Sequence, residues 1–254
     1  MKMKVALVIT VKNERDILRD NIVYHRHLGI GDVFVFLDGT TDDTAATIAD
    51  LPDVHVQNSV SPNGFRGIPA YAVLVKQWDS IFTARQSLNT VTAIAAARQR
   101  GYDWIIALDA DELVCPDPHR VYPGQLRDLL AGQPAEVQSV LFGTYEIVQR
   151  RMDYARVFVE ETLFKCPGGA IRKSIRDPLH ATHFTIDGFY GQKVGKSALR
   201  LTANARPRSS HRFVTMDGNW LKTANAGGLL HYYCYAYGYF VNKYRGMAQH
   251  PDQY

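Results

Sequence analysis

The stretch that decides the fold is Trp104-Ile105-Ile106-Ala107-Leu108-Asp109-Ala110-Asp111-Glu112. Its first five residues are apolar and do not alternate with polar ones, which is typical of a strand buried on both faces of a parallel sheet. Two carboxylates, Asp109 and Asp111, follow this strand directly. Because ligands bind beyond the carboxyl ends of the strands in open parallel sheets, we expect this acidic pair to lie at a binding site.

Two apolar runs of the same kind occur earlier in the chain, at 5–9 and 33–37, with a stretch of helical spacing between them. Strand, helix and strand in this order form a βαβ unit. The strand at 104–108 follows a helix-forming stretch at about 81–100. This order predicts an α/β fold with a mostly parallel central sheet flanked by helices. Weaker signals predict a helix at 43–50, a strand at 54–56, a helix at 125–131 and a strand at 137–142.

The composition is that of an ordinary globular protein of 254 residues, with 46% hydrophobic and 21% charged residues. The formal net charge of +4 is too small to favour a nucleic acid partner. The three cysteines match neither a disulfide framework nor a zinc-binding spacing. No stretch approaches the roughly 20 apolar residues that cross a bilayer. We expect a cytoplasmic protein, and peripheral contact with the inner face of a membrane stays open.

The spacing of Asp109 and Asp111 suits chemistry on a diphosphate. A Mg²⁺ or Mn²⁺ ion is commonly held by one or two carboxylates together with phosphate oxygens of the substrate. Such an ion neutralises the negative charge that builds up on a departing phosphate. The alternative is that the two acids only cap a helix or belong to a solvated turn. Their place after a buried strand favours the metal site.

Three segments together resemble the glycosyltransferases of the GT-A fold, near families 2 and 92: Val8-Ile9-Thr10-Val11-Lys12-Asn13-Glu14, Phe36-Leu37-Asp38-Gly39-Thr40-Thr41-Asp42-Asp43-Thr44 and the stretch at 104–112 quoted above. The resemblance covers roughly residues 4–115. It implies one domain over 1–254, in which 1–115 bind a nucleotide sugar and 116–254 bind the acceptor. It also implies that Asp109 and Asp111 meet the ribose and the metal. The donor-binding residues expected on this basis are Thr10, Val11, Lys12, Glu14, Asp38, Arg85, Asp109, Ala110 and Lys196.

Asp38 is expected to read the nucleobase. A carboxylate held in a pocket accepts the imide N–H of a base such as uracil, and a site built around that bond rejects partners that leave it unpaired. The alternative is an aspartate that only caps the turn at Gly39. Arg85 lies on the helix that precedes the acidic strand, where it either faces the donor or is simply exposed.

The second half of the chain resembles family 92 and related bacterial enzymes at Lys196-Ser197, at 229–232 and at 239–246. The likeness implies that a late histidine completes the metal shell, and His211 and His231 are the candidates. Imidazole binds manganese, although a lone histidine is more often a packed or surface residue. Lys196 is expected to contact a donor phosphate. A tyrosine-rich run at 232–240 is expected to pack on the sheet, with a sugar-stacking wall or a membrane contact as alternatives.

The function expected from these residues is a metal-dependent, inverting glycosyltransferase that moves a sugar from a nucleoside diphosphate donor, with UDP favoured, to a hydroxyl of a glycan or glycolipid. Inversion needs a general base opposite the leaving diphosphate. Glu146, Glu160 and Glu161 are the candidates, with Glu146 preferred because it follows the strand at 137–142. A nucleotidyltransferase and a non-catalytic sugar-nucleotide or glycan-binding module are the alternatives.

Overall fold

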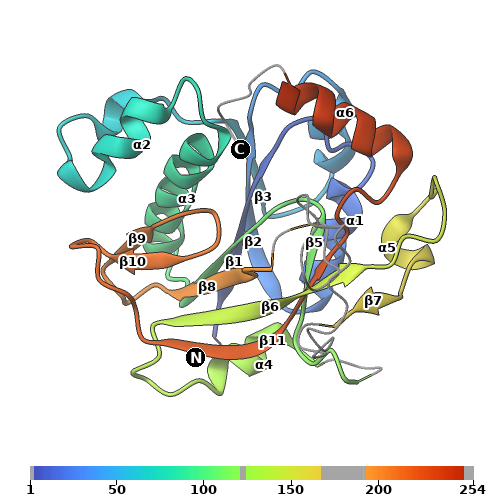
Figure 1. Cartoon of the computed structure of the whole chain (residues 1–254). Coiled ribbons are helices and arrows are strands. Elements are labelled where there is room, and N and C mark those ends of the chain that lie inside the picture. Colours follow the sequence, from blue (N-terminus) through green and yellow to red (C-terminus); the bar gives the residue numbers. More distant parts are fainter. Residues whose placement is uncertain (1–2, 121–123, 167–190, 192, 249–254) are drawn as a thin grey trace, which may run out of the picture.

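The computed structural model describes residues 3–120, 124–166, 191 and 193–248. Its centre is a nine-stranded sheet of order β3-β2-β1-β4-β8-β6-β11-β5, with β7 paired to β6 (Figure 1). The strands of this sheet are β1 (Val5–Val11), β2 (Ile30–Leu37), β3 (Val54–Asn58), β4 (Trp104–Leu108), β5 (Glu112–Cys115), β6 (Ser139–Ile147), β7 (Phe164–Lys165), β8 (Lys196–Arg200) and β11 (Thr223–His231). A separate two-stranded sheet consists of β9 (Ala205–Pro207) and β10 (Phe213–Thr215).

The first four strands, β1 to β4, pair in parallel. All seven residues of β1 are buried, as the continuous apolar run predicts. The register pairs Val11 with Leu37 and Ile9 with Leu108, so the carboxyl ends of β1, β2 and β4 meet at one edge. The α/β fold with a central sheet flanked by helices is therefore confirmed.

The second half of the sheet is mixed in direction. β8 runs antiparallel to both β4 and β6, and β11 runs parallel to β6 but antiparallel to β5. The expected parallel arrangement thus describes β1 to β4, and antiparallel strands extend it. An apolar pattern carries no information on strand direction, so the sequence alone did not reveal the mixed pairing of β5, β6, β8 and β11.

Helices cover both faces of the parallel strands. Figure 1 shows α2 (Ala72–Gln77) and α3 (Phe82–Gln99) on one side and α1 (Leu18–His27) on the other. Small buried residues, Ala93 and Ala97, let α3 lie close to the sheet. The remaining helices are α4 (Leu126–Ala131), α5 (Val157–Glu160), α6 (Tyr237–Ala248) and the 3-10 turns η1 (Asp43–Ile48), η2 (Pro62–Phe65) and η3 (Pro69–Tyr71).

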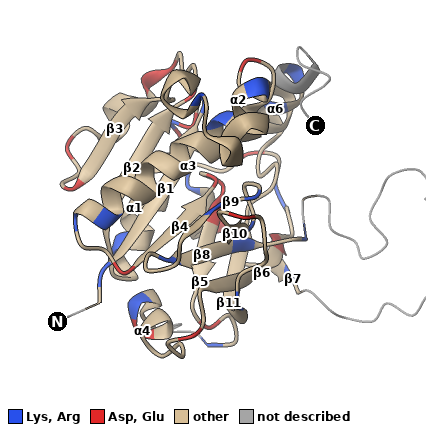
Figure 2. Cartoon of the chain, turned by 90° about the vertical axis from the view of Figure 1, so that its left-hand side faces the viewer, with Lys and Arg blue, Asp and Glu red and all other residues tan. Residues whose placement is uncertain are grey.

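Charged residues lie on many elements of the described chain (Figure 2). Figure 2 shows Lys and Arg on several helices and loops rather than gathered along one element. In the described part of the chain, no helix combines the length and the apolar character that crossing a bilayer requires. α6 lies above the carboxyl ends of the parallel strands (Figure 1) and therefore faces the acidic pair that follows β4.

Candidate active site

A cleft of about 1380 Å³ opens at the carboxyl ends of the parallel strands. Both halves of the chain line it, the first through the loops after β1, β2 and β4 and the second through α6 and the loops beside it. The expected site residues that line the cleft are Thr10, Lys12, Glu14, Asp38, Arg85, Asp109, Ala110, Asp111, His211 and His231. The topology thus brings together residues that the sequence separates by more than two hundred positions.

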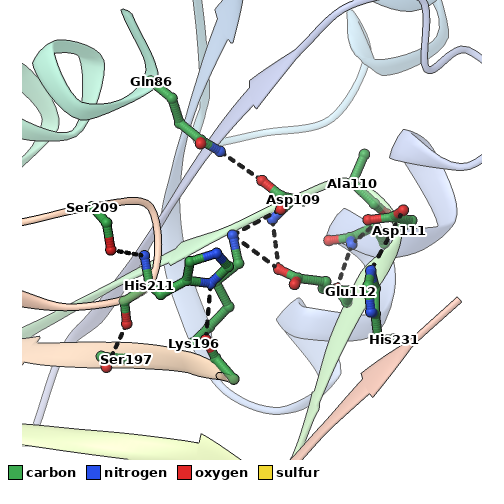
Figure 3. Close-up of polar contacts among 12 residues, drawn as sticks. Gln86, Asp109, Ala110, Asp111, Glu112, Lys196, Ser197, Ser209, His211 and His231 are labelled. Atoms are coloured by element: carbon green, nitrogen blue, oxygen red, sulfur yellow. Dashed lines mark hydrogen bonds and ion pairs between the residues drawn. The ribbon is translucent and has the colours of Figure 1, made fainter. Parts of the chain in front are cut away.

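Asp109 is held tightly at the floor of this cleft. Its Oδ2 accepts a bond from Lys196 Nζ at 2.8 Å, and its Oδ1 accepts one from Gln86 Nε2 at 2.5 Å (Figure 3). Burial alone would raise the pKa of Asp109, but the charge of Lys196 and the two hydrogen bonds outweigh it and lower the pKa to about 2. Asp109 is therefore ionised and fixed in one orientation, with 37% of its side chain still exposed to the cleft.

Lys196 lies below the floor rather than in the cleft. It is the first residue of β8, its side chain is fully buried, and its ammonium also lies 3.4 Å from Glu112 Oε2. Burial raises the pKa of Glu112 to about 8, against the opposing effect of Lys196. Glu112 Oε2 in turn accepts the backbone N–H of Asp109 at 2.9 Å. Lys196 thus reaches Asp109 from inside the protein instead of facing a phosphate.

Asp111 is surrounded more loosely than Asp109. Three groups approach its Oδ2: Lys243 Nζ at 3.4 Å, the Tyr239 hydroxyl at 3.5 Å and His231 Nε2 at 3.8 Å. None of these distances is as short as a good charge-assisted hydrogen bond, which spans about 2.7–2.9 Å. Lys243 and Tyr239 both belong to α6. The oxygen therefore has only long contacts with these three polar groups, although the Asp111 side chain is buried.

The two candidate histidines lie on opposite sides of the acidic cluster. Figure 3 shows His231 beside Asp111, and His211 beyond Lys196 on the side of Asp109. His211 Nδ1 lies 3.1 Å from the carbonyl oxygen of Gly195, to which it donates, so its Nε2 keeps a lone pair. Burial, together with the charge of Lys196, lowers the pKa of His211 to about 4. The two histidines therefore do not meet at one point with the acidic pair.

His231 is buried among neighbours that fix its position. It is the last residue of β11, where the register places it between Glu112 of β5 and Glu146 of β6. Burial lowers the pKa of His231, so its ring is neutral near pH 7. Its Nδ1 is buried without a hydrogen-bond partner, and a side chain at Gly191 would collide with the ring. A neutral imidazole in this position presents Nε2 towards Asp111.

Among residues 3–120, 124–166, 191 and 193–248, no group of three or more Cys, His, Asp and Glu side chains is arranged to hold a metal ion. A pair of candidate metal ligands is nevertheless present, because Asp111 Oδ2 and His231 Nε2 lie 3.8 Å apart. Two ligands that each stand about 2.1 Å from one ion are roughly 3 to 4 Å apart. The donor set fits an ion that takes its remaining ligands from water and phosphate oxygens.

Asp38 lies at the opposite wall of the cleft and is already paired. Its Oδ1 accepts bonds from Arg85 Nε at 2.8 Å and from Ser59 Oγ at 2.7 Å. The Arg85 guanidinium also donates to the carbonyl oxygen of Trp78 at 2.8 Å. Arg85 therefore orients Asp38 and is largely buried itself, rather than lying on the surface. Asp38 Oδ2, with Arg85 Nε at 3.0 Å, retains capacity to accept a further bond.

The residues after β1 differ in what they present. Glu14 is half-buried beside Asp111, and both desolvation and that neighbouring charge raise its pKa well above the usual value. Its Oε2 has no hydrogen-bond partner, while Tyr239 donates to Oε1 at 3.2 Å. Lys12 is exposed on the rim. Val11 does not line the cleft, but its carbonyl oxygen accepts the Asp38 N–H at 2.8 Å and so ties the two strand ends together.

The three candidate bases are placed differently. Glu146 is buried beside the cleft, where Lys165 Nζ lies 2.6 Å from its Oε1 and the Gly191 N–H donates to its Oε2. Glu161 is buried away from the cleft, and its bond from Arg150 lowers its pKa. Glu160 pairs with Arg151 near the surface. The structure thus brings only Glu146 to the neighbourhood of the cleft.

Several cleft residues were not singled out from the sequence. Tyr239 and Lys243 stand four positions apart on α6 and so share one helix face. Lys243 also lies over the rings of Tyr233 at 4.7 Å and Tyr239 at 5.4 Å. The spacing of Tyr239 and Lys243 was a usable signal, but the tyrosine-rich run was interpreted as packing. Glu112 was likewise missed as a functional neighbour of Lys196.

Comparison with known proteins identifies the chain's relatives. Two proteins of Arabidopsis thaliana, both described as glycosyltransferase-like, match 83% of this chain at 29% and 27% identity. The chain spans about half the length of these relatives, 49% of one and 43% of the other. No protein-family model matches the chain. The resemblance to glycosyltransferases drawn from the three motifs is confirmed by these relatives.

Solved structures give a weaker likeness. Glucosyl-3-phosphoglycerate synthase from Mycobacterium tuberculosis, in complex with Mn²⁺, uridine diphosphate and phosphoglyceric acid, is 14% identical, covers 90% of this chain and 70% of its own, and has a TM-score of 0.40. Mannosyl-3-phosphoglycerate synthase from Rubrobacter xylanophilus is 16% identical, covers 56% and 40%, and has a TM-score of 0.35. Scores this low carry no argument about the present site.

Proposed function

We propose that the chain is a glycosyltransferase that takes its sugar from a nucleoside diphosphate donor bound in the cleft. The observation that supports this most directly is the pairing of two unlike carboxylates at the end of β4. Asp109 is fixed and ionised by Lys196 and keeps 37% of its side chain exposed to the cleft, whereas Asp111 is more deeply buried and has only long contacts with Lys243 and His231. A fixed carboxylate beside one whose contacts can be exchanged suits a donor whose ribose and diphosphate must be held at separate points.

Donor recognition is assigned to the walls of the cleft. Asp38, oriented by Arg85 and Ser59, would accept the imide N–H of uracil through Oδ2. Asp109, held by Gln86 and Lys196, would accept a ribose hydroxyl. In this proposal Lys196 is a positioning residue, because its ammonium is buried and reaches the donor only through Asp109.

The departing diphosphate is assigned to the Asp111 side of the cleft. Asp111 and His231 would hold a divalent ion, Mn²⁺ or Mg²⁺, which when bound neutralises charge on the phosphate oxygens. Imidazole and carboxylate together are compatible with Mn²⁺. His211 would face the donor from the other side through its free Nε2. Burial and the neighbouring charge of Asp111 raise the pKa of Glu14, which reduces the negative charge that Glu14 would place near the diphosphate.

The acceptor side belongs to the second half of the chain, and a glycan or glycolipid hydroxyl is the acceptor we propose. Inversion at the anomeric carbon requires a base that removes the proton of this hydroxyl. Glu146 is retained as the candidate because His231 and Gly191, which contact it or flank it, both line the cleft. To serve as the base it would have to exchange the Gly191 N–H for the acceptor hydroxyl.

The test combines binding and turnover. UDP is expected to raise the melting temperature, and Mn²⁺ is expected to increase that rise, because a ligand that binds only the folded state stabilises it. Absence of a shift with any nucleoside diphosphate would contradict the proposal. Slow release of free sugar from a panel of UDP-sugars is then expected from an enzyme. Binding without any sugar release, with or without candidate glycan acceptors, would favour a non-catalytic binding module instead.

A further inference from the structure

We propose that Lys243 is a diphosphate-binding residue, and that its long contact with Asp111 is replaced by contacts with phosphate oxygens when a diphosphate binds. The inference rests on the proposed function, since it assumes a nucleoside diphosphate in the cleft. It assigns a part of the donor site to α6, where the resemblance at 239–246 gave no role to any residue. The observation behind the inference is that each carboxylate of the Asp109-Ala110-Asp111 motif contacts a different lysine, Asp109 contacting Lys196 and Asp111 contacting Lys243.

The two lysines differ in the distance to their carboxylates and in the exposure of their side chains. Lys196 Nζ lies 2.8 Å from Asp109 Oδ2, and the lysine is fully buried. Lys243 Nζ lies 3.4 Å from Asp111 Oδ2, and 26% of its side chain is exposed. An ammonium has three donors to place. At 3.4 Å, Lys243 makes a long contact with one carboxylate and retains capacity for phosphate oxygens.

The surroundings of Lys243 stabilise its positive charge in the cleft and leave its N–H donors available for hydrogen bonds. The ammonium lies over the faces of Tyr233 and Tyr239, which attract a cation without accepting a conventional hydrogen bond. Burial acts to lower the pKa of Lys243, but Asp111 outweighs it, so the pKa is raised and the side chain stays cationic. Asn242 and Arg245 of α6 line the same cleft.

An ion at Asp111 changes the balance at this point. A divalent cation and an ammonium cannot share one carboxylate oxygen without repelling each other. Lys243 therefore competes with an ion that binds alone. When a diphosphate enters together with the ion, the phosphate oxygens accept hydrogen bonds from Lys243. The ion and Lys243 then both favour binding of the diphosphate. The sign of the coupling between ion and lysine should thus depend on whether the diphosphate is present.

The experiment compares the wild-type chain with Lys243→Gln, Lys243→Arg and the control Lys222→Gln, whose exposed lysine pairs with Glu136 away from the cleft. Binding of UDP and of uridine is measured by calorimetry with Mn²⁺ present, and binding of Mn²⁺ alone by electron paramagnetic resonance. For Lys243→Gln we expect UDP affinity to fall about 10- to 100-fold, uridine affinity to stay unchanged, and Mn²⁺ alone to bind more tightly. Lys243→Arg and Lys222→Gln should retain the wild-type preference for UDP over uridine.

Two outcomes would overturn the inference: unchanged UDP affinity in Lys243→Gln, or an equal loss for UDP and uridine, which would indicate general damage to the cleft. Weaker binding of Mn²⁺ alone in that variant would overturn the proposed competition. The melting temperature of each variant shows whether it folds. If the wild-type chain itself binds no UDP, the proposed function fails, and the measurement with Mn²⁺ alone still decides whether Lys243 competes for Asp111.

Discussion

The sheet floor and the α6 roof of the cleft each supply one lysine to the same acidic motif, and the two sites differ in almost every physical respect. On the floor, the fully buried Lys196 lies 2.8 Å from Asp109 and 3.4 Å from Glu112. At the roof, the partly exposed Lys243 lies 3.4 Å from Asp111 and has no shorter contact with it. The comparison indicates that the first pair sets the shape of the site, whereas the second can change partners.

The strongest way to break this comparison is to remove the floor lysine. Lys196→Met would remove the buried ammonium that lies beside the partly exposed Asp109 and the buried Glu112, and loss of one partner from a buried ion pair costs about 3–5 kcal/mol of stability. Urea denaturation measures the loss. Lys243→Met should cost less, about 1–3 kcal/mol, because the contact with Asp111 is longer and Tyr239 and His231 stay beside that carboxylate. Equal losses in the two variants would show that the pairs are not different in kind.

The loss of stability in acid offers a second way to sharpen the comparison of floor and roof. We expect much of this loss to come from α1, on the other side of the sheet from α3 (Figure 1). His25 on α1 is fully buried, lies 2.9 Å from the carbonyl oxygen of Asn21 and accepts the Val114 N–H at 3.1 Å. Burial lowers the pKa of His25 to about 4. The unfolded chain therefore takes up a proton near pH 6.5, whereas the folded chain does so only near pH 4, and stability falls as the pH drops through this window.

The expected size of this effect is about 3 kcal/mol at pH 4 for the His25 contribution alone. It is measured as the difference in unfolding free energy between pH 7 and pH 4, in the wild type and in His25→Gln. The variant should be less stable at pH 7 but should lose less on acidification. An identical pH dependence in both proteins would place the acid sensitivity elsewhere, for example at His211 in the cleft.

A third prediction concerns the roof carboxylate. Asp111→Asn keeps the size of the side chain but removes the charge that Lys243 and the proposed ion share. Binding of Mn²⁺ should weaken at least about tenfold, or roughly 1.4 kcal/mol, and UDP should stabilise the variant equally with and without Mn²⁺. Differential scanning fluorimetry makes this comparison. A wild-type response to Mn²⁺ would remove Asp111 from the ion site.

The smallest expected effect on stability and binding comes from Gln86, whose side-chain amide donates to Asp109 on the floor of the cleft. Gln86→Leu removes the donor to Asp109 Oδ1 while Lys196 still holds Oδ2. Because Asp109 is partly exposed to the cleft and water can replace the amide, we expect a stability loss of about 1 kcal/mol. The binding of UDP should weaken slightly, without any change in its dependence on Mn²⁺. A changed dependence on Mn²⁺ would show that floor and roof are coupled.

The parallel half of the fold was predictable because its strands are continuous apolar runs. The expected strands at 5–9, 33–37 and 104–108 fall within β1, β2 and β4, and the helix expected at 81–100 is α3. From these elements and the rule that ligands bind at strand ends, the cleft positions of Asp38, Asp109 and Asp111 follow. Their roles stay predictions until binding is measured.

The antiparallel half and the roof were not predictable in the same way. β5 and β8 span only four and five residues, too few for a periodic signal of direction. Whether Lys196 faces a phosphate or Asp109 depends on which face of β8 it occupies, and that follows only from pairing with β4 and β6. The separation of His211 from His231 is likewise a matter of distances between loops that no spacing in the sequence encodes.

The pairing of β5 with β11 also has a consequence for how the molecule is made. β5 ends at Cys115, yet in the described sheet it lies at the edge with β11, which begins only at Thr223, as its neighbour. During synthesis β5 therefore lacks this neighbour until β11, more than a hundred residues later in the chain, has left the ribosome. Contacts so distant along the chain form slowly, which makes closure of this sheet edge the natural late step of folding.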